Sequence, residues 1–419
     1  MYPEYIGEDQ TNYVYRTLDF WTSGFFPGSL YLLFERRVRY PKYFCIGRGS
    51  EDPALPHYMQ LRHLCHWWSV NLHQNAARSG THDLGFMIAP WAIKAWELEG
   101  DHRAYNSLVI AAQSLVNRFD SRVQSLRSWD VCATKRYAFN DPSKDFLVII
   151  DNMLNLNLLF WVAQKTGDRL MYDIAVAHAR TTQRHHIRTD HSTFHVVNYD
   201  MHTGLPKSKF THQGYADNSC WARGQAWGIL GFMETFEWTG DWSFLSTARD
   251  LADYFVAHLP EDGVPCWDFD APAEPECPRD TSAGMVAGCG MLLIYKALKD
   301  VDKDAAAFYL KSTMRIVSGT LSKFLTPPVH FTLTPSNTPL PCNLEESSNQ
   351  VINQPASLAV TGADEVPEAI LHGATINNHE FAMRRWADHG LVYADYYFML
   401  LGNMLLEMGL IDVTPHAAH

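Results

Sequence analysis

Paired cysteines are missing from this 419-residue sequence. Its eight cysteines lie singly, with no Cys-x-x-Cys spacing: Cys45, Cys65, Cys132, Cys220, Cys266, Cys277, Cys289 and Cys342. This pattern excludes both a small disulfide-stapled scaffold and the usual zinc frameworks. The first residues, MYPEYIGEDQTNY, are acidic and polar, unlike a secretory signal. We therefore expect a cytoplasmic protein with reduced thiols.

A basic surface and a long apolar run are missing as well. The chain has 34 Lys and Arg residues against 46 Asp and Glu, which gives a net charge of −12. No basic run interleaved with aromatics occurs, so we expect no nucleic acid partner. No apolar stretch of about 20 residues is present, so we expect no membrane partner. Aromatic residues, in contrast, make up 13% of the chain, and such rings suit the stacking of sugars.

A Gly-Asp turn recurs in the sequences WELEGDHRAY (96–105), AQKTGDRLMY (163–172) and FEWTGDWSFL (236–245). Each turn ends an apolar run and starts an amphipathic one. Glycine can adopt the left-handed conformation that ends a helix, and the aspartate that follows can cap the next helix. The repeat therefore predicts a series of helical hairpins.

The runs before and after these turns differ in polarity. Six runs are apolar almost all round, which predicts buried inner helices: 20–38, 85–96, 152–163, 224–236, 282–298 and 395–410. Five amphipathic runs predict outer helices that face water: 58–72, 106–119, 173–183, 246–259 and 305–321. A sixth outer helix is expected near 9–17. The alternation predicts an all-α ring formed by one domain, 1–419, with an irregular loop insertion at 326–358.

Three charged residues share one position in this repeat. Asp83 lies 17 residues before Gly100, Asp151 lies 16 before Gly167, and Arg223 lies 17 before Gly240. At 1.5 Å per residue, each lies about 25 Å from its turn, at the N-terminal end of an inner helix. All three should therefore open onto one mouth of the ring. The alternative is that both aspartates merely cap helices.

Two carboxyl groups on facing helices can divide acid and base work between them. Asp151 lies in the apolar sequence VIIDNMLNL, and Asp83 lies beside His82 in THDLGFM. Burial among apolar neighbours raises the pKa of a carboxyl group, whereas a helix N-terminus lowers it. We expect burial to prevail at Asp151, so that its pKa is the raised one.

Substrate-binding groups are concentrated in the sequence FTHQGYADNSCWARGQAW (210–227). It offers an arginine between two tryptophans, together with two polar side chains: His212, Gln213, Trp221, Arg223 and Trp227. A permanent cation between aromatic faces suits a carboxylated sugar. The alternative is a buried Arg223 paired with one of the two aspartates.

Histidines are frequent in RHHIRTDHSTFHVVNYD (184–200). His186, His191 and His195 lack cysteine or acidic ligands at metal spacing, so we expect no metal site here. FHVVNYD has the pattern of a short strand, and His195 is the histidine expected to reach a substrate. In the Pro-rich loop 258–284, Asp268, Asp270 and Asp280 are expected to be turn and cap residues.

Several segments together resemble the unsaturated glucuronyl hydrolases, glycoside hydrolase family 88. They are, in chain order, FWTSGFFPG, HDLGFM, IIDNMLNL, HSTFHVVNYD, QGYADNSCWARGQAWG, PEDGVPCWDFDAP, RDTSA and DYYF. The similarity runs from about residue 18 to 298 and resumes at 390–400.

The resemblance implies an (α/α)6 barrel without metal or organic cofactor, acting as a monomer or weak homo-oligomer. It implies release of a 4,5-unsaturated uronic acid from lyase-generated, glycosaminoglycan-type oligosaccharides by hydration of the C4=C5 double bond. Asp151 would be the general acid and base, and Asp83 would hold and tune it. The residues implied to line the substrate site are Trp21, His82, Trp129, His195, His212, Gln213, Trp221, Arg223 and Trp227.

One departure from the family and two alternative functions stay open at this point. Where the family usually has Trp-Gly-Asp-Tyr, this chain has Tyr393-Ala394-Asp395-Tyr396, and 326–390 is hard to align. The preferred disaccharide and its sulfation therefore stay open. The alternatives are an inverting glycosidase acting on saturated glycosides, and a non-catalytic glycan-binding ring.

Overall fold

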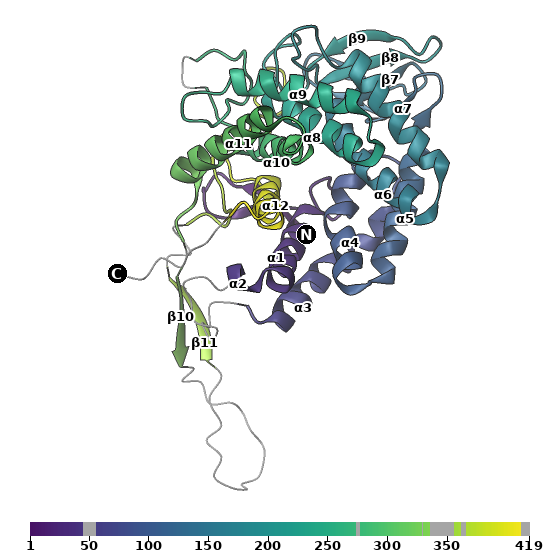
Figure 1. The fold of residues 1–419 in the computed structure, drawn as a ribbon. Helices are drawn as coiled ribbons and strands as arrows, with labels where there is room; N and C mark the ends of the chain where they lie inside the picture. The colour runs from purple at the N-terminus through teal and green to yellow at the C-terminus, as the bar shows by residue number, and fades with distance from the viewer. Residues whose placement is uncertain (45–55, 274–276, 329, 336–355, 362–365, 412–419) are drawn as a thin grey trace, which may run out of the picture.

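The fold is a closed ring of helical hairpins, an (α/α)6 barrel (Figure 1). The computed structural model describes residues 1–44, 56–273, 277–328, 330–335, 356–361 and 366–411. The inner helices are α1 (Phe25–Arg39), α4 (Leu84–Glu99), α6 (Leu156–Thr166), α8 (Ala222–Thr239), α10 (Thr281–Leu298) and α12 (Val392–Glu407). Each packs against the next, and α12 packs against α1, which closes the ring.

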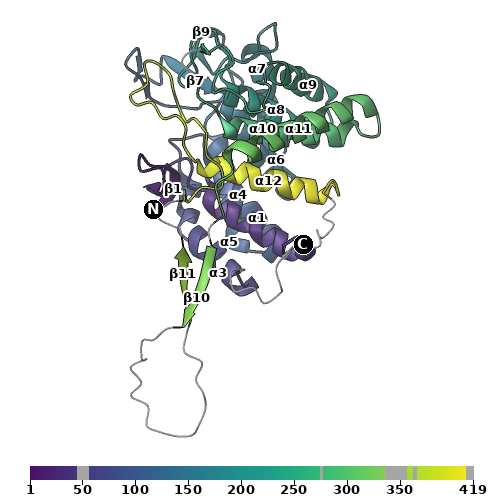
Figure 2. The same ribbon diagram turned by 90° about the vertical axis from the view of Figure 1, so that its left-hand side faces the viewer.

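The outer layer consists of α3 (Tyr58–Ser69), α5 (His102–Val116), α7 (Arg169–His185), α9 (Trp242–Ala257) and α11 (Lys303–Phe324). Two short helices, α2 (Pro41–Phe44) and the 3-10 helix η1 (Leu72–Ala77), connect α1, α3 and α4. Figure 2 shows α1 and α12 side by side, where the last inner helix packs against the first. The alternation of inner and outer helices confirms the ring predicted from the sequence.

The three Gly-Asp turns have the predicted geometry. Each glycine has a positive φ, of 66°, 76° and 66° at Gly100, Gly167 and Gly240. Each following aspartate accepts backbone N–H bonds as the cap of the next helix: Asp101, Asp168 and Asp241. The turns thus end the inner helices at one level and start the outer helices there.

The inner helix α10 is apolar enough for a membrane span by length and composition, but 83% of its 18 residues are buried inside the protein. Its side chains pack against α8 on one side and α12 on the other. Burial on every side inside a protein removes the apolar surface of such a helix from water. We therefore assign α10 to the core of the barrel.

The expected outer helix near 9–17 is wrong. This segment forms an antiparallel hairpin of β1 (Tyr2–Ile6) and β2 (Tyr13–Arg16). The Asp9 carboxylate accepts the backbone N–H groups of Thr11 and Asn12 and so stabilises the turn. Tyr-Val-Tyr-Arg is rich in the aromatic and β-branched residues that favour strands, which accounts for the difference.

A three-stranded antiparallel sheet, β7 (Asp145–Ile149), β8 (Val196–Asp200) and β9 (Pro206–Phe210), lies at one edge of the ring (Figure 1). Strand β8 confirms the strand predicted within 194–200. Two small hairpins precede it: β3 (Phe119–Asp120) with β4 (Ser125–Leu126), and β5 (Cys132–Ala133) with β6 (Ala138–Phe139). These strands are inserted around the N-terminal ends of the inner helices.

The segment 326–358, expected to be irregular, is partly regular where it is described. β10 (His330–Pro335) pairs with β11 (Ala356–Thr361) in an antiparallel ladder that projects from the ring (Figures 1 and 2). HFTLTP alternates polar and apolar residues, which is the period of a strand, and ASLAVT carries the β-branched Val360 and Thr361. The expectation came from the missing helical period and overlooked this shorter one.

Candidate active site

The three charged residues that share a repeat position lie at one mouth of the ring, as predicted. Asp83 immediately precedes α4, and Arg223 lies in the first turn of α8. Asp151 lies in a 3-10 turn, η2 (Ile150–Asn155), which leads into α6. Neither carboxylate makes the hydrogen bond of a helix cap, so the capping alternative is wrong for both.

Asp151 is a buried carboxyl group with an uncommitted oxygen. Its residue is 9% exposed, and Oδ2 has no hydrogen-bond partner among the described residues. Burial raises the pKa of Asp151 to about 7, against the opposing positive charge of Arg223. The neighbouring Asp83 carboxylate raises this pKa further. This supports the expectation that the effect of burial on the Asp151 pKa exceeds that of the helix N-terminus.

His195 presents a proton donor to Asp151. Its Nδ1 accepts the backbone N–H of His212 at 3.1 Å, so the ring proton of the neutral imidazole lies on Nε2. Nε2 lies 3.8 Å from Asp151 Oδ2, beyond hydrogen-bonding distance. Burial holds the pKa of His195 well below its usual value, so the ring is neutral.

Strand pairing determines this arrangement. β7 and β8 pair in register up to Ile149 and Val196, and the Ile150 N–H donates to the His195 carbonyl at 3.0 Å. The ladder therefore ends where the two functional side chains begin. A shift by one residue would turn both side chains to the opposite face of the sheet.

Aromatic rings line the mouth, and the predicted tryptophans are among them. Trp221 packs on His195 with ring centroids 4.5 Å apart, and Trp129 packs on His212 at 5.1 Å. The indole N–H groups of Trp221 and Trp227 are buried without a hydrogen-bond partner in the described residues. Trp227 nevertheless lies close enough to Asp151 to lower its pKa.

Trp21 joins the same wall from the segment before α1. Its ring contacts Tyr393 of α12 at 5.1 Å and Phe86 of α4 at 5.7 Å, and Phe86 contacts Trp227 at 5.4 Å. Rings from α4, α8, α12 and the segment before α1 thus meet at one place. Such a surface provides apolar faces for a sugar ring.

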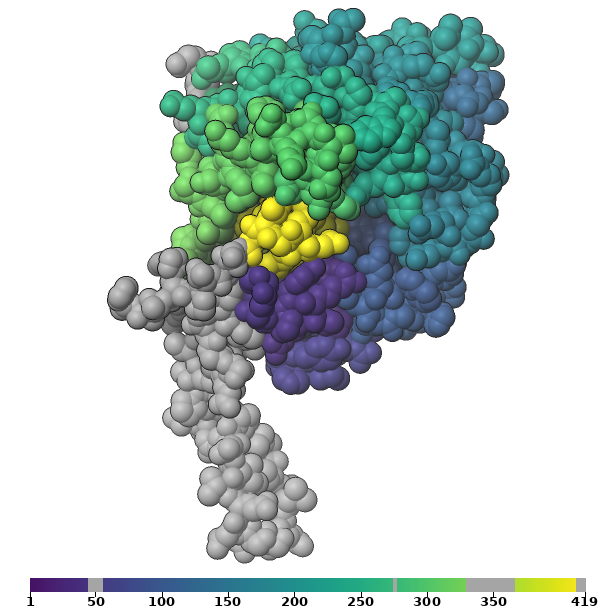
Figure 3. Space-filling view, viewed as in Figure 1, coloured from purple at the N-terminus to yellow at the C-terminus, as the bar shows by residue number. Residues whose placement is uncertain are grey.

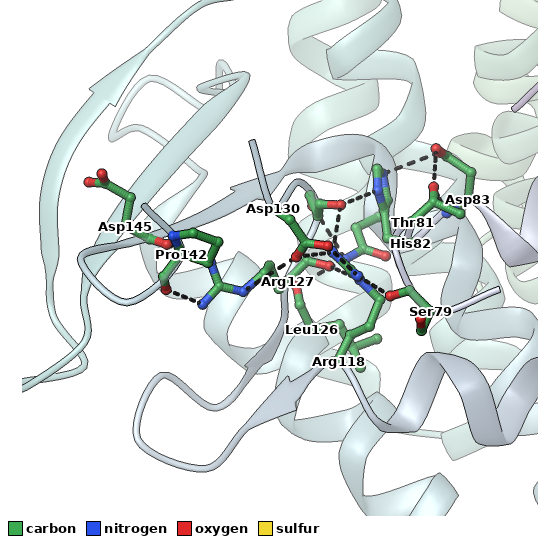
Figure 4. A network of polar contacts seen from close by, with 12 residues as sticks. Ser79, Thr81, His82, Asp83, Arg118, Leu126, Arg127, Asp130, Pro142 and Asp145 are labelled. Atoms are coloured by element: carbon green, nitrogen blue, oxygen red, sulfur yellow. Dashed lines mark hydrogen bonds and ion pairs between the residues drawn. The ribbon is translucent and has the colours of Figure 1, made fainter. Parts of the chain in front are cut away.

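His82 and Asp83 belong to a polar network behind this wall (Figure 4). The His82 Nε2 lies 3.3 Å from Asp83 Oδ1, and the Thr81 hydroxyl donates to Asp83 Oδ2 at 2.7 Å. His82 Nδ1 contacts the Ser128 carbonyl oxygen at 2.8 Å. Burial lowers the pKa of His82, although Asp83 opposes that shift.

Arg223 differs from the free cation expected for a carboxylated sugar. It is 1% exposed, and its Nη1 donates to Asp280 Oδ2 at 2.6 Å and to the Thr375 carbonyl at 2.5 Å. Its Nη2 donates to the Ile376 carbonyl at 2.7 Å. The alternative of a buried, paired arginine is therefore closer to the structure, with Asp280 as its partner instead of Asp83 or Asp151.

Of the remaining predicted residues, Gln213 lies beside Arg223 and His212 lies beside Trp129. Gln213 donates from Nε2 to the Ile376 carbonyl at 3.0 Å, and His212 shares a hydrogen bond of 2.9 Å with the Tyr137 hydroxyl. Burial lowers the pKa of His212 to about 4, so this ring is neutral. Asp280 also caps α10, as expected for an aspartate of the loop 258–284.

Sequence reasoning missed two contributors to the site. The Tyr393 hydroxyl is buried beside Arg223 without a hydrogen-bond partner in the described chain. The Thr375–Ile376 backbone supplies carbonyl acceptors from a segment that carried no motif. The Tyr393-Ala394-Asp395-Tyr396 sequence, already noted as unusual, was the one signal available for Tyr393.

Metal ligands do not converge at this mouth. Among the described residues, no group of three or more His, Cys, Asp or Glu side chains could hold a metal ion. His186 contacts the Val148 carbonyl at 3.1 Å, whereas His191 lies on a turn with φ of 67°.

A separate cavity of about 620 Å³ opens at the other end of the ring, where the inner helices finish. It is lined by residues of α6, α8, α10 and α12, including Asn157, Glu234 and Met404. Figure 3 shows the corresponding hollow beside α12. Burial raises the pKa of Glu234 to about 8, but the predicted site residues lie at the opposite mouth.

Comparison with individual known proteins, rather than with family models, places the chain in a family. No family model matches it. An unsaturated glucuronyl hydrolase of Formosa agariphila is 37% identical over 278 residues, which is 66% of this chain and 63% of that relative's length. An unsaturated glucuronyl hydrolase of Bacillus sp. is 32% identical over 306 residues, which cover 73% of this chain and 74% of that relative.

The chain belongs to the unsaturated glucuronyl hydrolase family. A crystal structure of a family member described as specific for heparin superposes with a TM-score of 0.72 at 28% identity. That superposition covers 98% of this chain and 92% of the other. The family similarity thus extends over segments that the sequence motifs left out.

Proposed function

We propose that the chain releases a 4,5-unsaturated uronic acid from the non-reducing end of lyase-generated oligosaccharides of the glycosaminoglycan type. The single observation that carries this proposal is Asp151, a buried carboxyl group with a pKa of about 7 and one unpartnered oxygen. Protonation of a carbon atom needs an acid that is still protonated near neutral pH. Its membership of the family supports the same reaction.

The reaction proposed is hydration of the C4=C5 double bond. The Asp151 carboxyl proton passes to C4, the electron pair of the double bond forms the new C–H bond, and the positive charge at C5 is shared with the ring oxygen. Water then adds to C5 and returns a proton to the Asp151 carboxylate. The resulting hemiketal opens, and C1 releases the remaining saccharide with its glycosidic oxygen.

Donors around Asp151 suit an anionic sugar. The His195 Nε2–H, the indole N–H groups of Trp221 and Trp227, and the Tyr393 hydroxyl are buried without partners in the described residues. Donors fixed in a buried site stabilise an anion without the cost of reorienting water. In Arg223, Nη1 and one Nη2 hydrogen are engaged, which leaves its remaining N–H groups for the substrate.

Asp83 is proposed to help keep Asp151 protonated, since its carboxylate raises the pKa of Asp151. The family number, glycoside hydrolase family 88, is part of this proposal, as are a cytoplasmic location and a monomer or weak homo-oligomer. The heparin specificity of one family member makes sulfated heparin disaccharides suitable first substrates to test.

The test is to incubate the protein with lyase-generated chondroitin, hyaluronan and heparin disaccharides while the ultraviolet absorbance of the unsaturated uronate is recorded. We expect absorbance loss with at least one of them, and no loss with Asp151→Asn at wild-type secondary structure. Turnover retained by Asp151→Asn would remove this residue from the chemistry. Release from saturated glycosides instead would support an inverting glycosidase, and tight binding without turnover would support a glycan-binding ring.

A further inference from the structure

Arg118 is a buried arginine behind the site, just after α5, with all of its donors used (Figure 4). Nε donates to the Arg127 carbonyl at 2.8 Å, and Nη1 and Nη2 donate to the two Asp130 oxygens at 3.3 and 3.0 Å. Nη1 also donates to the Ser79 carbonyl, and Nη2 donates to the Ser128 carbonyl at 3.2 Å. These contacts account for the five N–H groups of a guanidinium.

Ser128, which Arg118 holds, joins the segments that carry the two aspartates. Its carbonyl contacts His82, the neighbour of Asp83, while its hydroxyl oxygen accepts the Ile149 N–H at 3.0 Å. The Asn152 amide also reaches that hydroxyl, at 3.5 Å. Ser128 is therefore hydrogen-bonded to residues on both sides of Asp151 in the sequence and to His82, the neighbour of Asp83. It is fully buried.

The Ser128 carbonyl fixes where His82 carries its proton. A carbonyl oxygen only accepts, so His82 Nδ1 must donate to it. Nε2 of a neutral His82 then has a lone pair, which faces Asp83 Oδ1 at 3.3 Å. A second proton on His82 can therefore go only onto Nε2, where it would donate to this Asp83 oxygen.

We propose that Arg118 is a positioning residue: it holds the Ser128 carbonyl, which fixes the His82 tautomer and so keeps the His82 Nε2 turned toward Asp83. This role rests on the proposed function, because Asp83 matters there through its effect on Asp151. Nothing in the Arg118 contacts reaches the substrate mouth directly, so its effect is transmitted by Ser128 and His82.

The groups that face His82 decide the direction of the pH effect. Arg118 disfavours an imidazolium there, Asp83 and Asp130 favour it, and the neutral His178 lies nearby with its pKa lowered to about 3 by burial. Removing the Arg118 charge should therefore raise the pKa of His82. The doubly protonated ring, in which Nε2 donates to Asp83, would then form at higher pH.

The test compares Arg118→Met and Arg118→Lys with Arg122→Met. Arg122 is a matched control because it lies in the same region but is 54% exposed by side chain and paired only with Asp120. We expect Arg118→Met to lower kcat on the order of 10- to 100-fold, since a small misplacement in an active site costs that much, with KM changed less than about threefold. The acid limb of its pH–kcat profile should move to higher pH.

Arg118→Lys keeps the charge but not the forked geometry, so it should restore the acid limb and only part of kcat. ¹⁵N NMR of labelled histidines, with His82 assigned by its loss in His82→Gln, should show the Nδ1-protonated tautomer in the wild type and a mixture in Arg118→Met. This readout needs no substrate, so it stands even if no disaccharide is turned over.

The proposal is overturned if the His82 tautomer and the pH profile are unchanged in Arg118→Met, whether or not kcat falls. A fall in kcat alone would show a merely structural role. If Arg118→Met does not fold, Arg118→Lys decides: a wild-type kcat with a wild-type tautomer contradicts the proposal. Arg122→Met should match the wild type in every measurement.

Discussion

Replacing Asp151 by asparagine should stabilise the protein, and increasingly so as the pH rises. In the unfolded chain an aspartate ionises near pH 3.8, whereas burial raises the pKa of Asp151 to about 7 in the folded protein. Between these values the unfolded state gives up a proton that the folded state keeps. The stability contributed by protonated Asp151 is therefore fully present below pH 3.8 and is lost as the pH rises toward 7.

The size of this effect follows from the shift. Each pKa unit corresponds to about 1.4 kcal/mol, so a shift of about three units costs the folded wild type up to about 4 kcal/mol above pH 7. Asparagine has a similar shape and no charge, so it escapes this cost. The gain of Asp151→Asn over the wild type should rise by about 1.4 kcal/mol per pH unit between pH 4 and 7, and then level off.

Urea unfolding midpoints of the wild type and Asp151→Asn at pH 5, 6, 7 and 8 measure this difference. Asp145→Asn is the matched control, because its hydrogen bond with Asn198 and the charge of Lys207 lower the pKa of Asp145. Asp145 is ionised in both states across this range, so the effect of its substitution should not change with pH. A pH-independent difference for Asp151→Asn as well would refute a raised pKa at Asp151.

Two further predictions concern activity and the buried arginine. If Asp151 is the acid, kcat/KM should fall about tenfold per pH unit above its pKa of about 7, as measured by initial rates on an unsaturated disaccharide; a flat profile to pH 9 would contradict this. Arg223→Lys should cost about 3 kcal/mol, because one ammonium cannot reach Asp280 and two carbonyls together and Asp280 is 0% exposed. The exposed Arg169→Lys serves as control, and equal urea midpoints for the two variants would contradict the role of Arg223.

The local parts of the fold could be predicted from the sequence because each has a local cause. The Gly-Asp turns need only a residue that tolerates positive φ, such as Gly167, and a capping aspartate, such as Asp168. Counting back from those turns placed Asp83, Asp151 and Arg223 at one mouth. Helix geometry alone fixes that position, so no tertiary information was required.

The partners of these residues could not be predicted, because they come from distant segments. Asp280 and the carbonyls of Thr375 and Ile376 contact Arg223 from 57 or more positions away in the sequence. Every residue has a backbone carbonyl, so residue type does not indicate which carbonyls will be acceptors. The same holds for the Ser128 carbonyl beneath His82. At the N-terminus, the short hairpin was mistaken for a helix because the ring pattern demanded a sixth outer element there.

The 3-10 turn at Asp151 could not be predicted from the spacing of residues along the repeat either. The register placed Asp151 at the N-terminal end of a regular inner helix, whereas the 3-10 turn η2 forms there, between the end of β7 and the start of α6. The Ile150 N–H is used by the His195 carbonyl, which ties this turn to the sheet. Strand pairing, rather than helix propensity, thus sets the place of the acid.

The most direct test of the account follows two signals in one reaction with an unsaturated disaccharide. The first is the ultraviolet absorbance of the C4=C5 bond, and the second is the release of the reducing-end sugar. If Asp151 protonates C4, absorbance loss never lags behind sugar release, and the saturated disaccharide releases nothing. Sugar release that precedes the absorbance loss, or release from the saturated disaccharide, would contradict hydration and point to displacement at the anomeric carbon.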